Sequence, residues 1–334
     1  MAVQRVLGAE STGSNEENFN LALRPQSLDE CVGQENVKQK LSIAIQAAKG
    51  RDEPLEHILF YGPPGLGKTT LANVIASEMN AALRVTSGPA LAKQGDVMGM
   101  LSNISTGDIL FIDEIHRLNA SVEEFIYPAM EDFKVDFTVD SGLHAKTINF
   151  PLKRFTLIGA TTRAGLLSSP LRSRFGMLYH LEYYTIEELT KIVSRSARLL
   201  ELECNQDALK LIASRSRSTP RIANRLLKRV RDYAQVKGTG KLTTEIVEAS
   251  LDMERIDHLG LDELDRSFLK ALINVYEGGP AGIEAVAATL GEERDTLEDV
   301  VEPYLLQTGF LRRTKRGREV TPAAYEHLNM QPKQ

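Results

Sequence analysis

Short apolar runs alternate with amphipathic stretches over the first half of the chain. Three runs of this kind are HILFYG, DILFID and FTLIGATT. Short apolar runs bounded by turn residues are typical of strands that are buried on both faces of a parallel sheet. The stretches between them, such as LANVIASEMN and VEEFIYPAMED, have helical spacing. Residues 21–184 are therefore predicted to form an α/β domain, a parallel sheet with helices on its faces.

Two further patterns occur within this domain. Apolar residues at helical spacing predict an amphipathic helix that starts near residue 35 and ends at Gly50; they are Val37, Leu41, Ile45 and Ala48. Residues 133–150 contain two β-rich arms around Ser141 and Gly142, which predict an inserted hairpin. An ordinary hairpin packed on its own sheet is the alternative interpretation.

The second half of the chain has two different patterns. Residues 185–255 have helical spacing almost throughout, and the clearest helix spans 218–234, with Pro220 at its first position. Its predicted buried stripe consists of Ile222, Leu226, Val230 and Tyr233. From residue 256 on, three helices precede two β-rich arms around a turn at 315–318, which is the order of a winged helix. The predicted organisation is a flexible polar tail at 1–20, the α/β domain at 21–184, a small helical domain at 185–255 and a winged-helix domain at 256–334.

The composition excludes several classes of protein. Hydrophobic residues make up 42% of the 334 residues and charged residues 25%, values typical of globular proteins rather than of disordered or collagen-like chains. The chain has no apolar run long enough for a membrane span and no signal-peptide core at its start, so a cytoplasmic protein without membrane contact is expected. Cys31 and Cys204 lack partners at metal-ligand or redox spacing and are interpreted as small hydrophobic residues.

A glycine-rich motif, GPPGLGKTT, lies between the first apolar run and a predicted helix. It fits the G-x-x-x-x-G-K-[ST] pattern in the strand–loop–helix context of a phosphate-binding loop. Three glycines allow backbone amides to point at phosphate oxygens: Gly62, Gly65 and Gly67. Lys68 is the expected charge on the β and γ phosphates, and Thr69 offers a hydroxyl to Mg²⁺ at the helix N-terminus. The motif therefore predicts a site for ATP and Mg²⁺.

Two acidic residues, Asp113 and Glu114, follow the second apolar run. Ligands of open α/β sheets bind at the carboxyl ends of the strands, so both carboxylates are expected beside the phosphate-binding loop. There, Asp113 can hold Mg²⁺ through water, and Glu114 can orient and polarise the attacking water.

The combination of P-P-G-x-G-K-T with a strand that ends in Asp-Glu resembles the AAA+ ATPases, whose subunits form rings with nucleotide at the seams. Four further segments match one family of that class in order: LRPQSLDECVGQ, GATTRAG, PLRSRFG and STPRIANRLL. Together with the terminal winged helix, they resemble the bacterial RuvB family over nearly the whole chain, although Cys31 stands where such motifs often have an aromatic residue. The resemblance implies an ATPase that forms a homohexameric ring. It also implies that the ring pulls double-stranded DNA and drives branch migration of Holliday junctions in recombination and repair.

The resemblance assigns roles to residues outside the two motifs. Around the adenine and ribose it places Leu23, Arg24, the loop Val32-Gly33-Gln34 and Tyr184. Further nucleotide contacts are expected from Thr70, Glu131, Asp132, Phe133 and Arg172. Thr162 is expected to contact the γ phosphate from the end of its strand, with Thr161 as the less favoured candidate. Arg221 would reach the same phosphate from the small helical domain.

Two arginines in the segment PLRSRFG are candidates for an arginine finger. An arginine supplied across a subunit interface can stabilise the charge of the transition state and accelerate hydrolysis by about 10³ to 10⁵. The position in the motif favours Arg174 for this role, with Arg172 supporting it or contacting the same phosphates. Which of the two is the main finger stays open.

The predicted wing carries five cations within seven residues: Arg312, Arg313, Lys315, Arg316 and Arg318. A basic hairpin can bind backbone phosphates without reading the sequence. The preceding helix contains six acidic residues, and such a surface is repelled by the major groove: Glu292, Glu293, Asp295, Glu298, Asp299 and Glu302. We therefore expect DNA contacts from Arg313, Arg316 and Arg318, with help from Arg294, and no base readout.

The resemblance implies two protein partners, RuvA at the four-way junction and RuvC in the resolving complex. The predicted hairpin is the expected contact for RuvA, through Phe137, Val139, Leu143 and Ile148. One alternative function is a clamp-loader-like or initiator-like switch that hydrolysis merely resets, and another is a sequence-specific regulator with an ATPase module. The basic wing argues against the first alternative, and the acidic helix argues against the second.

Overall fold

The computed structural model describes residues 23–139 and 146–331. The predicted tail at 1–20, and Ser141, Gly142 and Leu143, lie outside this part of the chain. The described chain divides into two compact units. The first spans Arg24–Glu182, and the second holds Leu23 and the residues from Tyr183 on.

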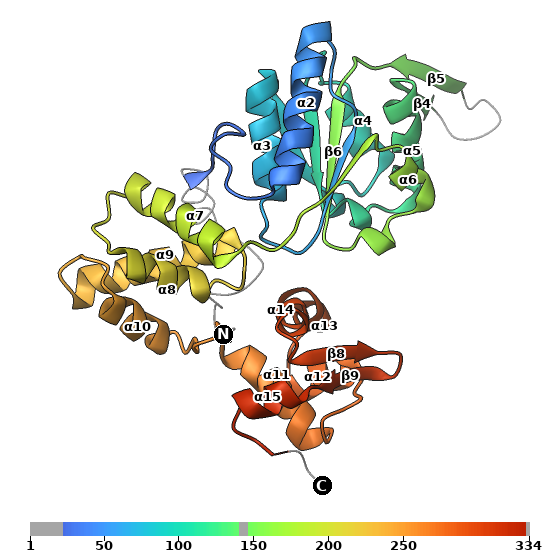
Figure 1. The fold of residues 1–334 in the computed structure, drawn as a ribbon. Helices are drawn as coiled ribbons and strands as arrows, with labels where there is room; N and C mark the ends of the chain where they lie inside the picture. Colours follow the sequence, from blue (N-terminus) through green and yellow to red (C-terminus); the bar gives the residue numbers. More distant parts are fainter. Residues whose placement is uncertain (1–22, 140–145, 332–334) are drawn as a thin grey trace. The chain divides into compact units, whose positions relative to one another are not determined.

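The first unit is built on a five-stranded parallel sheet with the strand order β2-β3-β6-β1-β7 (Figure 1). The strands are β1 (Ile58–Tyr61), β2 (Leu83–Ser87), β3 (Ile109–Asp113), β6 (Thr156–Thr161) and β7 (Met177–His180). The helices are α2 (Glu35–Arg51), α3 (Lys68–Met79), α4 (Gln94–Leu101), α5 (Ala120–Glu131) and α6 (Ser169–Ser173), with short 3₁₀ turns η1 (Gly88–Ala90), η2 (Ile115–Arg117) and η3 (Ala164–Leu166). The predicted α/β class is confirmed, and the three apolar runs form the three central strands.

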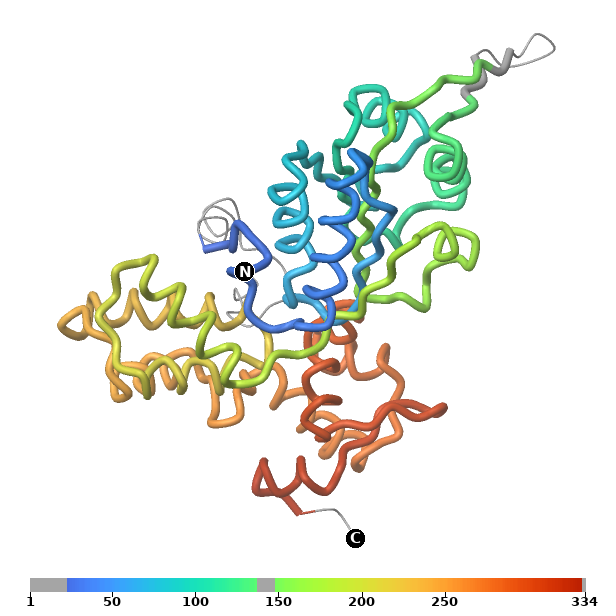
Figure 2. Tube along the Cα trace, turned by 45° about the horizontal axis from the view of Figure 1, so that its top comes forward, coloured from blue at the N-terminus to red at the C-terminus, as the bar shows by residue number. Residues whose placement is uncertain are grey.

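The central strands are buried because helices cover both faces of the sheet. Alternate strand residues point to opposite faces, and Leu59, Leu110 and Leu157 pack against buried side chains of α4 and α5. Helices α2 and α3 lie together on the other side of the sheet (Figures 1 and 2). The continuous apolar runs predicted this burial on two faces.

Helix α2 continues past its predicted end. Gly50 lies inside the helix, which ends at Arg51, and Asp52 takes the left-handed conformation at its C-terminus with φ 55°. Glycine permits a helix to end but does not force it to, and Asp tolerates this conformation because its short side chain can bond locally. The prediction of an end at Gly50 was wrong by one residue.

His57 ties the start of the sheet to helix α5. Its Nδ1 accepts a hydrogen bond from the Leu157 amide at 2.9 Å, and its Nε2 lies 3.0 Å from the Met130 carbonyl. Because Nδ1 accepts, the neutral ring carries its proton on Nε2 and donates it to Met130. Burial lowers the pKa of His57, against smaller opposing effects of the Met130 bond and Glu56.

A two-stranded antiparallel hairpin follows α5 directly. It consists of β4 (Lys134–Val139) and β5 (Lys146–Pro151) and forms a sheet separate from the five-stranded one (Figure 1). The predicted hairpin is confirmed. Ile148 is exposed, and so is Phe150, which the sequence reasoning did not single out. The side chains of Phe137 and Val139 lie outside the described part of the chain.

The second unit contains two apolar cores, and the first belongs to four helices. They are α7 (Ile186–Leu199), α8 (Gln206–Ser214), α9 (Pro220–Lys237) and α10 (Thr244–Met253). Pro220 opens α9 as predicted, because proline fits the first turn of a helix, where its missing N–H is not needed. Ile222, Leu226 and Val230 are buried, but Ala234 rather than Tyr233 completes the stripe.

The second core belongs to a winged helix. Its elements are α11 (Glu263–Val275), α12 (Ile283–Leu290), α13 (Arg294–Thr296), the π-turn η4 (Leu297–Val301), α14 (Glu302–Gln307), β8 (Leu311–Thr314), β9 (Gly317–Val320) and α15 (Pro322–His327). The predicted order of three helices and a two-stranded wing is confirmed. The turn is shorter than predicted, because Thr314 pairs with Gly317 and leaves only Lys315 and Arg316 between the strands.

The π-turn has a local cause in Pro303. Proline has no N–H to donate, and in a regular α-helix its ring collides with the carbonyl four residues earlier, here that of Asp299. A π-turn widens the backbone at this point and relieves the collision. The third helix of the winged helix is therefore continuous but irregular.

A buried arginine joins the two cores of the second unit. Arg217 lies between α8 and α9, and its guanidinium pairs with Asp265 at the start of α11 and donates from Nε to the Gly260 carbonyl at 2.9 Å. Arg217 and Asp265 are both buried, and the guanidinium also lies 5.2 Å from the centre of the Tyr304 ring. The four-helix part and the winged helix are thus linked by charge as well as by the chain.

Within the described ranges, 23–139 and 146–331, no helix has both the length and the apolar composition needed to cross a membrane.

Candidate functional site

The glycine-rich loop turns sharply from β1 into α3. Gly62, Gly65 and Gly67 have φ values of 139°, 80° and 98°, a region that side chains disfavour. A Cβ at Gly62 would lie 2.6 Å from the Leu181 carbonyl oxygen, so the loop is packed against the chain as well as bent. The loop delivers its amides to the N-terminus of α3, where backbone N–H groups and the helix dipole attract anions.

Lys68 is the first residue of α3 and is only 8% exposed. Its ammonium donates to the carbonyls of Gly62 and Pro63, both at 2.8 Å. A buried ammonium needs acceptors, and here the loop's own carbonyls supply two of them. A phosphate that enters the loop would offer the same group stronger, charged acceptors.

The strand ends bring the predicted chemistry to one edge of the sheet. β6 lies between β1 and β3, and the register pairs Thr161 with Tyr61, the last residue before the loop. Asp113 ends β3 on the other side of β6. The loop, the end of β6 and the Asp113–Glu114 pair therefore leave the sheet on three adjacent strands, as predicted.

These groups fit a magnesium nucleotide. The glycine conformations, the enclosed ammonium and the helix N-terminus form a phosphate cradle, and Thr69 and Asp113 supply oxygen atoms of the kind that Mg²⁺ prefers. Within the described ranges there is no cluster of three or more His, Cys, Asp or Glu side chains that could hold a metal alone. That pattern suits Mg²⁺, which binds to one or two protein groups together with substrate phosphates.

Glu114 sits at a left-handed turn with φ 48°, and its amide donates to Asp113 Oδ1 at 2.9 Å. Its carboxylate reaches outward and accepts a hydrogen bond from Arg117 at 3.1 Å. The backbone here is closely packed, because a Cβ at Gly88 would lie 2.4 Å from the Glu114 carbonyl oxygen. The turn thus holds the backbone while the carboxylate remains accessible to water.

The two candidate sensor threonines have different surroundings. Thr161 is 1% exposed, and its hydroxyl lies 3.0 Å from His116 Nδ1 and accepts a hydrogen bond from the Arg163 amide. Thr162 is half-buried, so its side chain is more accessible. The geometry favours Thr162 for contact with a ligand. His116, two residues after Glu114, was missed by sequence reasoning, although the segment DEIHRL places it beside the acidic pair.

Arg174 is held by several groups of its own subunit. Its guanidinium stacks on the Tyr127 ring at 4.1 Å, donates to the Pro170 carbonyl at 2.6 Å and pairs with Glu131 at 3.2 Å. The side chain is 20% exposed, and among the described residues its enclosed Nε has no hydrogen-bond partner. Arg172, by contrast, is exposed.

Tyr127 is itself fixed by a second set of contacts. Its hydroxyl donates to Glu123 at 2.5 Å, and Glu123 also accepts a hydrogen bond from Ser168, which caps the N-terminus of α6. Burial and the hydrogen bond to Glu123 raise the pKa of Tyr127. Sequence reasoning missed Glu123 and Tyr127, although Glu123, Tyr127 and Glu131 follow one another at intervals of four and so mark one face of α5.

The residues predicted around the adenine are divided between the two units. In the first unit, the Gln34 side chain exchanges two hydrogen bonds with the backbone of Glu182, at 2.7 and 3.2 Å. In the second unit, Leu23 is buried and the Tyr184 amide donates to the Ser218 carbonyl at 3.0 Å. Arg221 is half-buried and is the second residue of α9.

The wing has an exposed edge and a paired interior. Arg312, Arg313, Lys315 and Arg316 are exposed. Arg318 is 12% exposed; its Nε donates to Glu302 at 2.5 Å and its Nη2 donates to Glu298 at 2.9 Å. Although burial opposes its charge, these carboxylates raise the pKa of Arg318.

This pairing gives Arg318 and two of the acidic residues surroundings that the sequence did not predict. Arg318 is enclosed by two carboxylates and is 12% exposed, so it is less accessible to phosphates than Arg313, which also pairs with Glu302 but is 52% exposed. Glu298 and Glu302 face the wing rather than the solvent, and Glu302 is only 1% exposed. The exposed acidic residues of the third helix are therefore fewer than the sequence suggests. Arg294 is exposed and pairs with Glu284 at 2.9 Å.

Family models match the chain in three consecutive segments. Residues 23–181 match the Holliday junction DNA helicase RuvB P-loop domain, residues 184–257 the RuvB AAA lid domain, and residues 258–329 the RuvB C-terminal winged helix domain. The chain belongs to the RuvB family. The resemblance inferred from the motifs is thereby confirmed, as is the fold of P-loop, lid and winged-helix domains.

Relatives within the RuvB family align along almost the whole length. The Holliday junction branch migration complex subunit RuvB of Kosmotoga olearia is 56% identical over 315 residues, which cover 94% of this chain and 92% of the relative. A solved structure described as the Thermotoga maritima RuvB Holliday junction branch migration motor has 55% identity and a TM-score of 0.85, and the match covers 93% of this chain and 99% of that one. A mutant of the same Thermotoga maritima protein has 55% identity and a TM-score of 0.86, with 92% and 99% covered.

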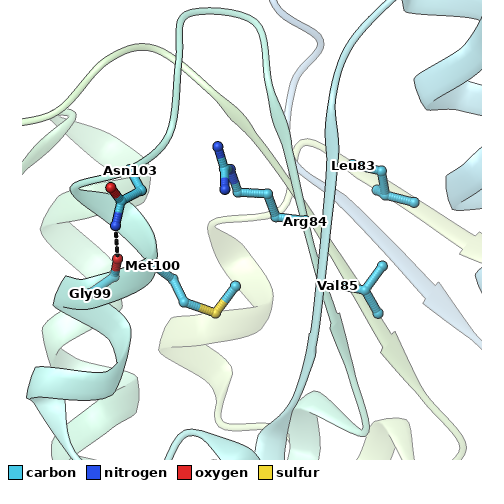
Figure 3. A pocket seen from close by; sticks show the side chains of 6 residues that line it. All are labelled: Leu83, Arg84, Val85, Gly99, Met100 and Asn103. Atoms are coloured by element: carbon cyan, nitrogen blue, oxygen red, sulfur yellow. Dashed lines mark hydrogen bonds between the residues drawn. The ribbon is translucent and has the colours of Figure 1, made fainter.

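A pocket of about 530 Å³ lies away from the predicted nucleotide site of this RuvB-family chain. It is lined by Leu83, Arg84, Val85, Gly99, Met100 and Asn103. In Figure 3, Arg84 extends from β2 toward α4, where the Asn103 side chain bonds to Gly99. Leu83 and Arg84 begin β2, whereas the phosphate-binding edge lies at the strand ends, so the pocket is not part of that edge.

Proposed function

We propose that this chain is the ATP-driven motor of Holliday junction branch migration, acting as a homohexameric ring that pulls double-stranded DNA. One observation carries the proposal: a single RuvB-family chain has both a phosphate cradle and a basic wing. Asp113 and Glu114 lie at the edge of the cradle, and the wing lies in the C-terminal domain. In this proposal residues 21–184 bind and hydrolyse ATP, residues 185–255 report the nucleotide state, and residues 256–334 bind DNA.

The chain's own groups have distinct tasks at the phosphates. Lys68 neutralises charge on the β and γ phosphates, Thr69 and Asp113 hold Mg²⁺, and Thr70 adds a contact at the helix N-terminus. The metal ion, when bound, neutralises the charge that develops on the phosphates. Glu114 orients the attacking water, which its outward carboxylate can reach, and Thr162 contacts the γ phosphate.

The remaining nucleotide contacts follow the family resemblance. Leu23, Arg24, Tyr184 and the Val32-Gly33-Gln34 loop surround the adenine and ribose, and Arg221 reaches the γ phosphate from the lid. The neighbouring subunit contributes Arg174 as the finger, with Arg172 beside it. Glu131, Asp132 and Phe133, at the end of α5, form further contacts with nucleotide. Hydrolysis then requires two adjacent subunits, and in a closed ring every nucleotide site has such a neighbour.

The wing holds DNA through its backbone. Arg313 and Arg316, with Arg312 and Lys315, bind phosphates, Arg294 assists, and Arg318 stiffens the wing from inside. Four phosphate contacts give a slope of about −3 to −4 for log K against log salt concentration. A grip of this kind is similar at every sequence, which a translocating motor needs.

The exposed hairpin suits a protein partner. Ile148 and Phe150 are apolar and exposed next to the described end of the hairpin, and we infer that they contact RuvA at the junction. RuvC joins in the resolving complex, and the machinery works in the cytoplasm on chromosomal DNA.

Movement of a synthetic four-way junction tests the function. The junction is incubated with the protein and ATP, with and without a RuvA-type partner, and the products are separated on gels. Strand separation by the wild type and none by Lys68→Ala is the expected result. Binding without movement under every condition would instead favour a nucleotide-dependent switch.

A further inference from the structure

Helix α5 presents three side chains in one row toward α6. Glu123, Tyr127 and Glu131 are four residues apart, so they lie on one face of the helix. Each of them reaches the segment that carries Arg174: Glu123 bonds to Ser168, Tyr127 stacks on the arginine, and Glu131 pairs with it. The row therefore contacts both the start of α6 and the guanidinium just beyond its end.

We propose that Tyr127 is a positioning residue for the arginine finger and is itself held in place by Glu123. In this proposal Glu131 pairs with the guanidinium until a phosphate of the nucleotide bound to the neighbouring subunit replaces it. This inference rests on the proposed function, in which Arg174 acts across a subunit interface.

The ring contact limits the freedom of the arginine. An arginine side chain has many rotamers, and ordering it at the moment of reaction opposes catalysis. The guanidinium carbon lies over the Tyr127 ring, 4.1 Å from its centre, which is close enough for cation–π attraction to keep the side chain ordered beforehand. A charged group that is already oriented stabilises a transition state without further rearrangement.

The contacts of Arg174 differ in how easily they can be exchanged. The Tyr127 ring is half-buried, whereas Glu131 is 55% exposed and contacts the guanidinium at 3.2 Å. A phosphate is a stronger acceptor than this exposed carboxylate. A phosphate of the neighbouring subunit's nucleotide can therefore displace Glu131, while the contacts of Arg174 with the Tyr127 ring and the Pro170 carbonyl remain.

The central experiment compares Tyr127→Met with Tyr127→Phe in the assembled protein with DNA. Methionine fills the space without an aromatic face, and phenylalanine keeps the face but loses the hydroxyl. We expect kcat for ATP to fall about tenfold in Tyr127→Met, with KM changed less than about twofold, and to stay within about threefold of wild type in Tyr127→Phe. Equal kcat in Tyr127→Met and wild type, or an equal fall in both variants, would overturn the proposal.

Two further measurements separate positioning from damage to the fold. In an Arg174→Ala background, Tyr127→Met should cause no further loss, because the residue acts only through the arginine. In mixed rings, Lys68→Ala subunits bring an intact finger, so they should restore turnover to Tyr127→Met subunits. An additive loss, or no restoration by any mixture, would contradict the proposed role.

The matched control lies on the same helix. Glu124 is exposed and points away from the row, so Glu124→Gln should leave kcat unchanged, whereas Glu123→Gln should lower it in part. If Arg174→Ala itself retains full hydrolysis, the finger assignment fails. If Arg174→Ala loses hydrolysis and Tyr127→Met does not, only the inference about Tyr127 fails.

Discussion

Arg316 and Arg318 are two residues apart on the wing, yet they have different surroundings. Arg316 lies exposed in the turn, and Arg318 is enclosed by Glu298 and Glu302. A charged side chain in solvent is free to bind phosphate. Within a buried ion pair, removal of one partner destabilises the fold, because the other charge is then left buried without compensation.

The two arginines should therefore respond differently to substitution. Arg318→Ala leaves Glu302 buried with only Arg313 as a partner, so we expect a loss of about 2 to 4 kcal/mol in the free energy of unfolding. Arg316→Ala should change it by less than about 0.5 kcal/mol but reduce the salt slope of DNA binding by about 1. Urea unfolding and binding titrations at several salt concentrations measure both; a stable Arg318→Ala protein with weakened DNA binding would contradict this assignment.

Arg174 and Arg172 form a second contrast between neighbouring arginines. Arg174→Ala should retain nucleotide binding, measured with a fluorescent ATP analogue, but lose at least about 10²-fold in hydrolysis. Mixing it with Lys68→Ala should restore part of the turnover, because each variant supplies the group that the other lacks. Arg172→Ala serves as the comparison, and a larger loss there would transfer the finger role to Arg172.

At the scale of elements, the hairpin β4–β5 is a separate two-stranded sheet with apolar side chains in solvent. Val135 anchors the hairpin in the core of the first unit, but Ile148 and Phe150 stay exposed, and exposed apolar side chains of this kind mark a surface that a partner can cover.

The double substitution Ile148→Ser with Phe150→Ser should weaken binding of a RuvA-type partner at least about tenfold, because two apolar contacts are lost. Hydrolysis of ATP without that partner should remain within about twofold of wild type. Calorimetric titration with the partner measures the first quantity. Unchanged affinity would exclude this pair from the interface.

The contacts of His57 between α5 and the sheet make the stability of the first unit depend on pH. The pKa of His57 is lower in the folded chain than in the unfolded one, so the unfolded state binds the proton more tightly. Stability is thus fully present above the unfolded value near 6.5 and falls as the pH drops below it, when protonation of Nδ1 removes the bond from Leu157.

We expect the free energy of unfolding to decrease more between pH 7 and pH 5 in the wild type than in His57→Asn. Urea unfolding at both pH values provides the measurement, and the exposed His180→Asn is the matched control. An identical pH response in His57→Asn and wild type would show that the buried ring is not the titrating group.

Local motifs explain why much of the site was predictable. The phosphate-binding loop, Asp113 and Glu114 lie in short segments whose neighbours in sequence are also their neighbours in space, and apolar runs revealed the strands that position them. The enclosure of Arg318 could not be predicted, because its partners come from a helix that only tertiary packing brings to the wing. Tyr127 was missed for the same reason, because the contacts of the row on α5 with Ser168 and Arg174 form only when α6 packs against it.

At the scale of the whole molecule, Arg217 joins the lid helices to the winged helix inside one compact unit. It precedes Arg221, the proposed nucleotide sensor, by four residues, and its partner Asp265 lies in the first turn of α11, the first helix of the winged helix.

Arg217→Ala should destabilise the second unit by about 3 to 5 kcal/mol, because Asp265 remains buried without its main partner. Hydrogen exchange should then become faster in the first turn of α11, where Asp265 lies, and in the segment between α8 and α9. Arg229→Ala is the control; Arg229 is exposed, lies 3.9 Å from the half-buried Glu254, and its loss should leave exchange unchanged. Equal exchange in Arg217→Ala and wild type would show that the pair does not couple the two cores.

A protein that pulls on DNA must transmit force from the domains that bind ATP to the domain that holds the DNA. If residues 255–262 were a flexible linker, the lid could rotate without moving the winged helix, and the force would be lost. The salt bridge of Arg217 joins the two parts directly, so in the proposed motor a rotation of the lid would be passed to the winged helix rather than absorbed by the linker.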